Sequence, residues 1–297
     1  MSKSTKPFFE IYARAPVMGA AFGLLIVLSS IILSAHSIQA FFSLEGLIIV
    51  IGGVIAVAFM SYRAGDVKNA LNAIIEMFKI PQMSHQNLHR DMTNIIDWAC
   101  LIKEKGMRSL ESNIAKNGMD DPFVKYGLNM VVSQYSPEEV RAMMETAADA
   151  CYERDSIPVD VLHAMASHAP AFGMVGTLVG MVTMLCSLSD NVAVIGSSLA
   201  VSFLSTLYGV MSARMVYMPA ASRLRQEVDS RRFRNQLITE GMVLLVANKN
   251  PMYIHDRLNS FLRPDVHDYF DYFKAKIIRP KLAVNQAIPP ILKAVGA

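Results

Sequence analysis

Charged side chains are scarce in this sequence. Asp, Glu, Lys and Arg together make up 18% of its 297 residues, whereas hydrophobic residues make up 53%. Because about a quarter of the residues in an average soluble domain are charged, this composition disfavours a purely soluble protein. It also excludes intrinsic disorder, which requires low hydrophobicity. The formal net charge of +3 is too small to indicate a nucleic-acid partner.

Cysteine and the motifs of common enzymes are lacking as well. Three cysteines, Cys100, Cys151 and Cys186, have neither CxxC nor metal-ligand spacing, so we expect no disulfide framework and no zinc site. His163 and His168 lie five residues apart, off the i, i+4 spacing that places two metal ligands on one helix face. The sequence contains no P-loop, GxSxG or HExxH motif. We therefore predict neither an enzyme nor a bound cofactor.

The hydrophobic residues are concentrated in four runs, at residues 17–35, 46–62, 169–188 and 192–218. Each run approaches or exceeds the roughly 20 residues that a helix needs to cross a bilayer core. Their one charged residue is Arg214, near the end of the fourth run, where a long side chain can reach the headgroups. The sequence predicts an all-α membrane protein with four spans.

Basic residues set the orientation of these spans. Arg63 and Lys68 directly follow the second run, and the fourth run is followed by Arg223, Arg225, Arg231, Arg232 and Arg234. Since cytoplasmic flanks are rich in Lys and Arg, both ends face the cytoplasm, and so do both chain termini. The spans therefore form two hairpins, at residues 17–62 and 169–218.

The remaining segments are predicted to be cytoplasmic. Residues 1–16 form a short N-terminal segment, and residues 219–297 form a helix and a tail. Residues 63–168 combine charge with helical apolar spacing, which predicts a helical domain between the second and third spans. Within it, the sequence Ser136-Pro137-Glu138-Glu139 is typical of a helix start.

The four runs lack Asp, Glu, Lys and His at mid-depth. Groups of this kind usually carry protons or ions across a membrane protein. If the protein moves ions, a titratable group must therefore come from another chain.

Small and hydroxylated residues mark the third and fourth runs. The small residues at close-packing spacing are Gly173, Gly176 and Gly180. The hydroxyl side chains are Thr177, Ser205 and Thr206. These hydroxyls either bond to backbone carbonyls of their own helix or line a partly hydrated path for a cation.

Two prolines, Pro170 and Pro219, lie near the cytoplasmic ends of the third and fourth runs. Each removes a backbone donor and permits a kink. They are either structural breaks or hinges that transmit an event in the membrane to the cytoplasmic domain.

Residues 169–185 and 205–224 resemble the third and fourth helices of MotA/PomA-type flagellar stator subunits, within the MotA/TolQ/ExbB proton channel superfamily. Residues 47–53 resemble the second helix of that family. Four spans with a large insert after the second fit MotA, whereas ExbB and TolQ have three. The resemblance covers roughly residues 17–260.

This resemblance implies a homo-pentamer in the bacterial inner membrane around a dimer of a single-span, peptidoglycan-anchored subunit of the MotB/PomB type. A membrane aspartate of that partner would accept the ion, H⁺ or Na⁺. Thr177, Ser205 and Thr206 would line the ion path, and Pro170 and Pro219 would couple it to the cytoplasm. Hydroxyls at both threonine positions resemble the sodium-type stators, and proton use stays open.

The resemblance also implies a contact with a flagellar rotor of the FliG type through residues 103–111. Lys103 and Glu111 match the basic and acidic positions of the family, whereas Glu104 and Ser112 depart from its charge pattern. Arg214 stands where relatives carry a neutral polar residue. A solvated helix face is the alternative for the charged stretch. For the whole protein, the alternatives are an energiser of another ion-driven envelope machine and a non-conducting membrane scaffold.

Overall fold

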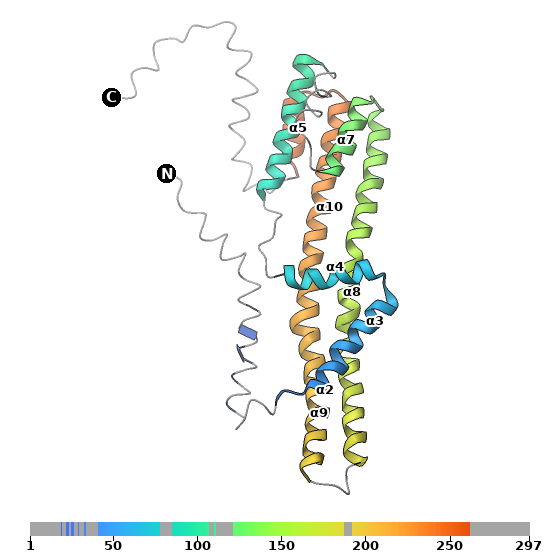
Figure 1. Cartoon of the computed structure of the whole chain (residues 1–297). Coiled ribbons are helices and arrows are strands. Elements are labelled where there is room, and N and C mark those ends of the chain that lie inside the picture. The colour runs from blue at the N-terminus through green and yellow to red at the C-terminus, as the bar shows by residue number, and fades with distance from the viewer. Residues whose placement is uncertain are drawn as a thin grey trace, which may run out of the picture. The chain divides into compact units, whose positions relative to one another are not determined.

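The computed structural model describes residues 41–77, 85–106, 110, 121–186 and 192–261, with isolated positions between residues 19 and 33 (Figure 1). Most of the first predicted span, residues 17–35, lies outside the described residues. In the described part of the chain, every regular element is a helix. The chain divides into two compact units: Met1–Met83 with Cys151–Arg231, and Ser84–Ala150 with Arg232–Ala297.

The first unit begins with one continuous helical run over the second predicted span. It consists of α2 (Leu44–Leu47), the π-helical turn η2 (Ile48–Gly52) and α3 (Gly53–Ser61). The Ser43 hydroxyl oxygen starts this run by accepting a hydrogen bond from the Gly46 amide at 3.2 Å. After an extended Tyr62, α4 (Ala64–Glu76) follows. The 18 residues Leu44–Ser61 are long and apolar enough to cross a membrane.

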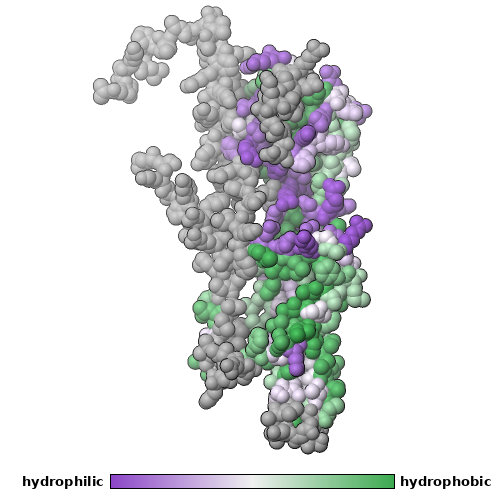
Figure 2. Space-filling model, in the orientation of Figure 1, coloured by the Kyte–Doolittle hydropathy of each residue, from purple (hydrophilic) through white to green (hydrophobic). Residues whose placement is uncertain are grey.

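Long helices carry the third and fourth predicted spans. α8 (Pro137–Cys186) has 50 residues, and α9 (Val192–Met211) leads through the π-helical turn η3 (Ser212–Tyr217) into α10 (Met218–Val246). With Leu44–Ser61, they make three helices in the described residues that could cross a membrane. Hydrophobic side chains gather over α2, α3 and α9 (Figure 2), and exposed ones include Met174, Leu178 and Phe203. The protein is thus an all-helical membrane protein.

Neither predicted break point ends its helix. α8 runs through both Pro158 and Pro170 without interruption. Pro219 is the second residue of α10, directly after η3, and the Met218 amide bonds five residues back to the Ala213 carbonyl. A π-type turn is rare and often lies at a functional site in a helix. Any bending at these prolines therefore occurs within helices.

The core of the first unit joins α4 to the apolar helices. Val67, Ala70 and Ala73 recur every three residues along α4 and are buried. They share one cluster with residues of the other helices, including Val54, Leu162, Met165, Ala169 and Tyr217. The amphipathic pattern of α4 thus leads to packing in this unit, although its residues fall in the predicted domain 63–168.

The second unit contains α5 (His85–Lys105), α7 (Pro122–Val132), the start of α8, the end of α10 and α11 (Pro251–Asn259). Its core includes Met92, Leu128, Met144, Leu237 and Met242. The predicted helix start at Ser136 is confirmed. The Glu139 amide donates to Ser136 Oγ at 3.3 Å and the Ser136 amide donates to Glu139 Oε2 at 2.9 Å, a reciprocal capping box.

Candidate functional site: the α8–α9 helix pair

Helices α8 and α9 touch through their backbones. A methyl group on Gly209 of α9 would lie 2.6 Å from the Ala169 carbonyl oxygen of α8. One on Gly173 would lie 3.1 Å from the Ser205 carbonyl oxygen. Only glycine permits such an approach, because any Cβ would force the helices apart.

The other two glycines predicted for helix packing also face α9. A Cβ on Gly176 would meet the Ser205 side chain, and one on Gly180 would lie 2.8 Å from the Ser198 carbonyl oxygen. Gly173, Gly176 and Gly180 follow one another at spacings of three and four residues, so they occupy one face of α8. The structure places all three against α9.

Ser205 lies inside this contact. Its side chain has no exposed surface, and its Oγ donates to the Val201 carbonyl at 2.7 Å. A Cβ on Gly46 of α2 would lie only 2.7 Å from this oxygen. Ser205 therefore sits where α2 approaches the α8–α9 pair, and α2 covers it.

Thr177 and Thr206 are both half-buried, and helix geometry places them on one edge of the pair. Thr206 Oγ1 donates across the interface to the Gly173 carbonyl at 3.5 Å. Thr177 follows Gly173 by four residues, one turn along the same face of α8. Since Thr206 points about 100° away from its neighbour Ser205 around α9, α2 covers Ser205 and leaves the threonines on another edge.

Backbone carbonyls accept the hydrogens of both hydroxyls along this edge. Thr177 Oγ1 donates its proton to the Met174 carbonyl at 2.6 Å, and Thr206 donates to Gly173. A hydroxyl that donates its hydrogen retains lone pairs to offer. The edge therefore presents two hydroxyl oxygens that retain lone pairs. Among the described residues there is no cluster of His, Cys, Asp and Glu that could hold a metal ion.

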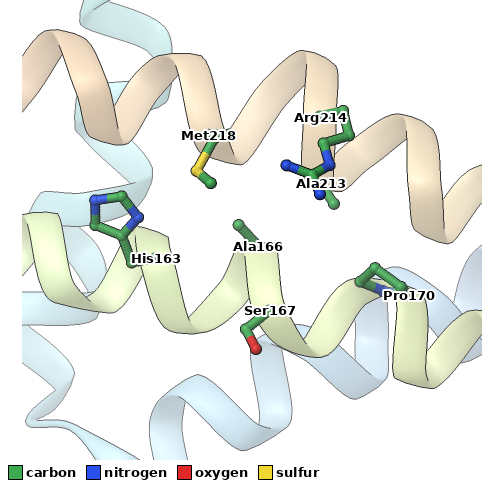
Figure 3. A pocket seen from close by; sticks show the side chains of 7 residues that line it. All are labelled: His163, Ala166, Ser167, Pro170, Ala213, Arg214 and Met218. Atoms are coloured by element: carbon green, nitrogen blue, oxygen red, sulfur yellow. The ribbon is translucent and has the colours of Figure 1, made fainter.

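Pro170 lines a cavity of about 250 Å³ between α8 and the η3–α10 helix (Figure 3). The lining residues are His163, Ala166, Ser167, Pro170, Ala213, Arg214 and Met218. Sequence reasoning did not assign this cavity. The sequence feature that points to it is the spacing of three and four residues that places His163, Ser167 and Pro170 on the same face of α8 as Thr177.

The predicted rotor-contact residues belong to the second unit. Lys103 is exposed in the last turn of α5, whereas Glu111 lies outside the described residues. This unit also holds Arg234, which bonds to both Asp91 and Asp121. Burial raises the pKa of Asp121, but the hydrogen bond and charge of Arg234 and the backbone hydrogen bonds from Phe123 and Val124 together lower it by more, so this pKa lies below its usual value.

A second ion-pair network joins α8, α10 and α11 within the same unit. Glu240 accepts hydrogen bonds from Arg141 at 2.7 Å and from Arg257 at 2.9 Å. Burial raises the pKa of Glu240, and the two arginines lower it by more, for a net decrease. These partners hold the ends of the two long helices together in this unit.

Comparison with known proteins identifies the family. A model of the MotA/TolQ/ExbB proton channel family matches residues 115–236. The uncharacterized protein YtxD of Bacillus subtilis is 30% identical over 246 residues, which cover 82% of this chain and 88% of that protein. The chemotaxis protein PomA of Vibrio alginolyticus is 29% identical over 248 residues, covering 84% and 94%.

A solved structure has the same fold. The flagellar MotAB stator complex from Bacillus subtilis contains a chain that matches with a TM-score of 0.73 and 22% identity, over 86% of this chain and 98% of that one. The matching family is one of channels, in agreement with the prediction that this chain is not an enzyme. By its similarity to relatives over most of their length, the chain belongs to the MotA/TolQ/ExbB proton channel family, among its MotA/PomA-like stator proteins.

Proposed function

We propose that this chain is the ion-conducting stator subunit of a flagellar motor and converts a proton- or sodium-motive force into rotation. The observation that carries the proposal is the edge formed by Thr177 and Thr206, two hydroxyl oxygens between helices long enough to span a membrane. Such oxygens can replace part of the water shell of a cation in transit. The similarity to PomA and to the flagellar MotAB complex supports motility and chemotaxis as the process served.

The proposed path needs a partner. The predicted spans carry no acid, so the group that takes up and releases the ion comes from a second chain. We assign this role to a single-span, peptidoglycan-binding subunit of the MotB/PomB type, with five copies of this chain around two of that subunit. The complex lies in the bacterial inner membrane, with four spans in this chain and both termini in the cytoplasm.

Coupling to the rotor is assigned to the predicted prolines and charges. Pro170 lines the cavity beside the threonine edge, and Pro219 follows the π-helical turn η3, so both can bend their helices without ending them. Lys103 and Glu111 would contact a FliG-type rotor. The departures at Glu104 and Ser112 favour a second candidate, the energiser of another envelope machine, as does the match to an uncharacterized relative.

The test is to replace each threonine in the complete complex. Thr177→Ala and Thr206→Ala should each abolish ion-driven motion and reduce ion flux at least ten-fold while leaving assembly intact, because each removes one ligand of the path. Thr183→Ala is the matched control, since Thr183 Oγ1 donates to the Val179 carbonyl of its own helix at 2.9 Å but lies off this edge. Unchanged motion in both threonine variants would refute the path.

Ser205→Ala tests whether the hydroxyl that α2 covers takes part in conduction, in addition to those of Thr177 and Thr206. If conduction uses only the edge that α2 leaves uncovered, this variant should conduct at near the normal rate. A loss of flux in Ser205→Ala with assembly intact would extend the path to the serine, as the sequence predicts.

A further inference from the structure

The cavity that contains Arg214 lies on the same edge of the helix pair as the two threonines. On α8, His163, Ser167, Pro170, Met174 and Thr177 follow at spacings of four, three, four and three residues. Such spacing keeps residues on one helix face. On the other side, Thr206, Val210, Arg214 and Met218 follow at spacings of four. At one end of both rows, the residues line the cavity. At the other end, Thr206 bonds to Gly173.

This order places the cavity between the threonines and the cytoplasm. Arg214 follows Thr206 by eight residues, which is about 12 Å along a helix. The fourth span enters the cytoplasm after Met218, where the arginine-rich segment begins. An ion that passes the threonines along this edge therefore reaches the cavity last.

Arg214 supplies the cavity with a permanent charge. Of the seven lining residues, it is the one that carries a charge at every physiological pH. Its side chain is exposed, and no carboxylate in the described part of the chain pairs with it. Ser167 and His163 offer polar atoms that can hold water, whereas the other lining residues are apolar.

We propose that this cavity is the cytoplasmic vestibule of the ion path, and that Arg214 makes conduction asymmetric by repelling cations that would enter from the cytoplasm. The inference rests on the proposed function. A unit charge about 6 Å away in water-like surroundings lowers the local concentration of a monovalent cation about three-fold. When the potential drives cations outward, their capture from the cytoplasm limits the rate and depends on their concentration in the cavity. When it drives them inward, capture on the other face of the membrane limits the rate, so inward flow is affected less.

The experiment measures flux in both directions in inverted membrane vesicles that contain the complete complex with its partner, so that the cytoplasmic face is outside. Potentials of either sign drive the ion while a pH- or sodium-sensitive dye reports its rate. Arg214→Gln should raise flux from the cytoplasmic side about three-fold and change inward flux by less than two-fold. Arg214→Lys should keep the normal ratio, because it keeps the charge.

Two controls define the result. Arg223→Gln removes the same charge nine residues further along the same helical run, outside the cavity, and should leave the ratio unchanged. In the unmodified complex, raising the salt on the cytoplasmic side to about 1 M should abolish the asymmetry, since the Debye length falls to about 3 Å.

An unchanged ratio in Arg214→Gln, in a complex whose conduction still depends on Thr177 and Thr206, would overturn the vestibule and leave the proposed function standing. Loss of a bound anionic phospholipid from that variant in native mass spectrometry, with flux unaltered, would also overturn it and identify the cavity as a lipid site. Conduction that is unchanged by substitution of both threonines would instead refute the proposed path itself.

Discussion

At the scale of single residues, Arg234 connects two acidic side chains of the second unit. Its guanidinium bonds to Asp91 on α5 and to Asp121, whose carboxylate also caps α7 by accepting from the Phe123 amide at 2.9 Å. The net lowering of the Asp121 pKa means that the folded state favours its charged form. The interaction therefore stabilises the fold above the usual pKa of 3.8 and is lost as the pH falls through the lower folded value.

Asp121→Asn tests this contribution. Asparagine caps a helix about as well as aspartate, so the variant removes the charge and retains the cap. We expect it to lower the stability of the detergent-solubilised protein at pH 7 by about 1–3 kcal/mol. It should also make the stability depend less on pH below about pH 4. Thermal unfolding between pH 3 and pH 7 measures both effects. Parallel pH curves for the two proteins would show that Asp121 contributes no charge-dependent stability.

At the scale of elements, helix α8 begins far along the chain from the segment that carries Thr177. Its 50 residues begin at a capping box between Ser136 and Glu139. Ser136→Ala should destabilise the protein by about 1 kcal/mol and speed amide exchange in the first turn, because an orphan amide loses its acceptor. Hydrogen exchange with mass spectrometry reads this out, and faster exchange around Gly173 would contradict a local effect.

The helices also show how much of the fold can be predicted from the sequence. Helices cover the predicted runs 46–62, 169–188 and 192–218 almost throughout their described residues, because a long charge-free run leaves few alternatives in a bilayer. The continuity of α8 through Pro158 and Pro170 was not predictable, since a proline is tolerated when surrounding packing holds the helix. Nor could the sequence separate Ser205 from Thr206. They are adjacent hydroxyls, and only the position of α2 distinguishes them.

At the scale of the whole molecule, the proposed function predicts an assembly. Native mass spectrometry of the tagged protein, extracted gently from its own membranes, should give five copies with two of a single-span subunit that has an acid in its membrane segment. The physical reason is that the predicted spans of this chain contain no Asp, Glu, Lys or His at mid-depth. A homo-oligomer without a second chain would favour the non-conducting scaffold.

The π-helical turn η3 governs the rotational phase of the helix that carries Thr206, Arg214 and Met218. In a regular α-helix, residues spaced by four drift about 40° at each step, so a row of this kind gradually winds away from its groove. Because a π-type turn takes more residues per revolution, it counters that drift over Ser212–Tyr217. In a regular α-helix, the three steps from Thr206 to Met218 would add up to a drift of about 120°. The extra residue in this turn is thus what keeps distant positions on one line.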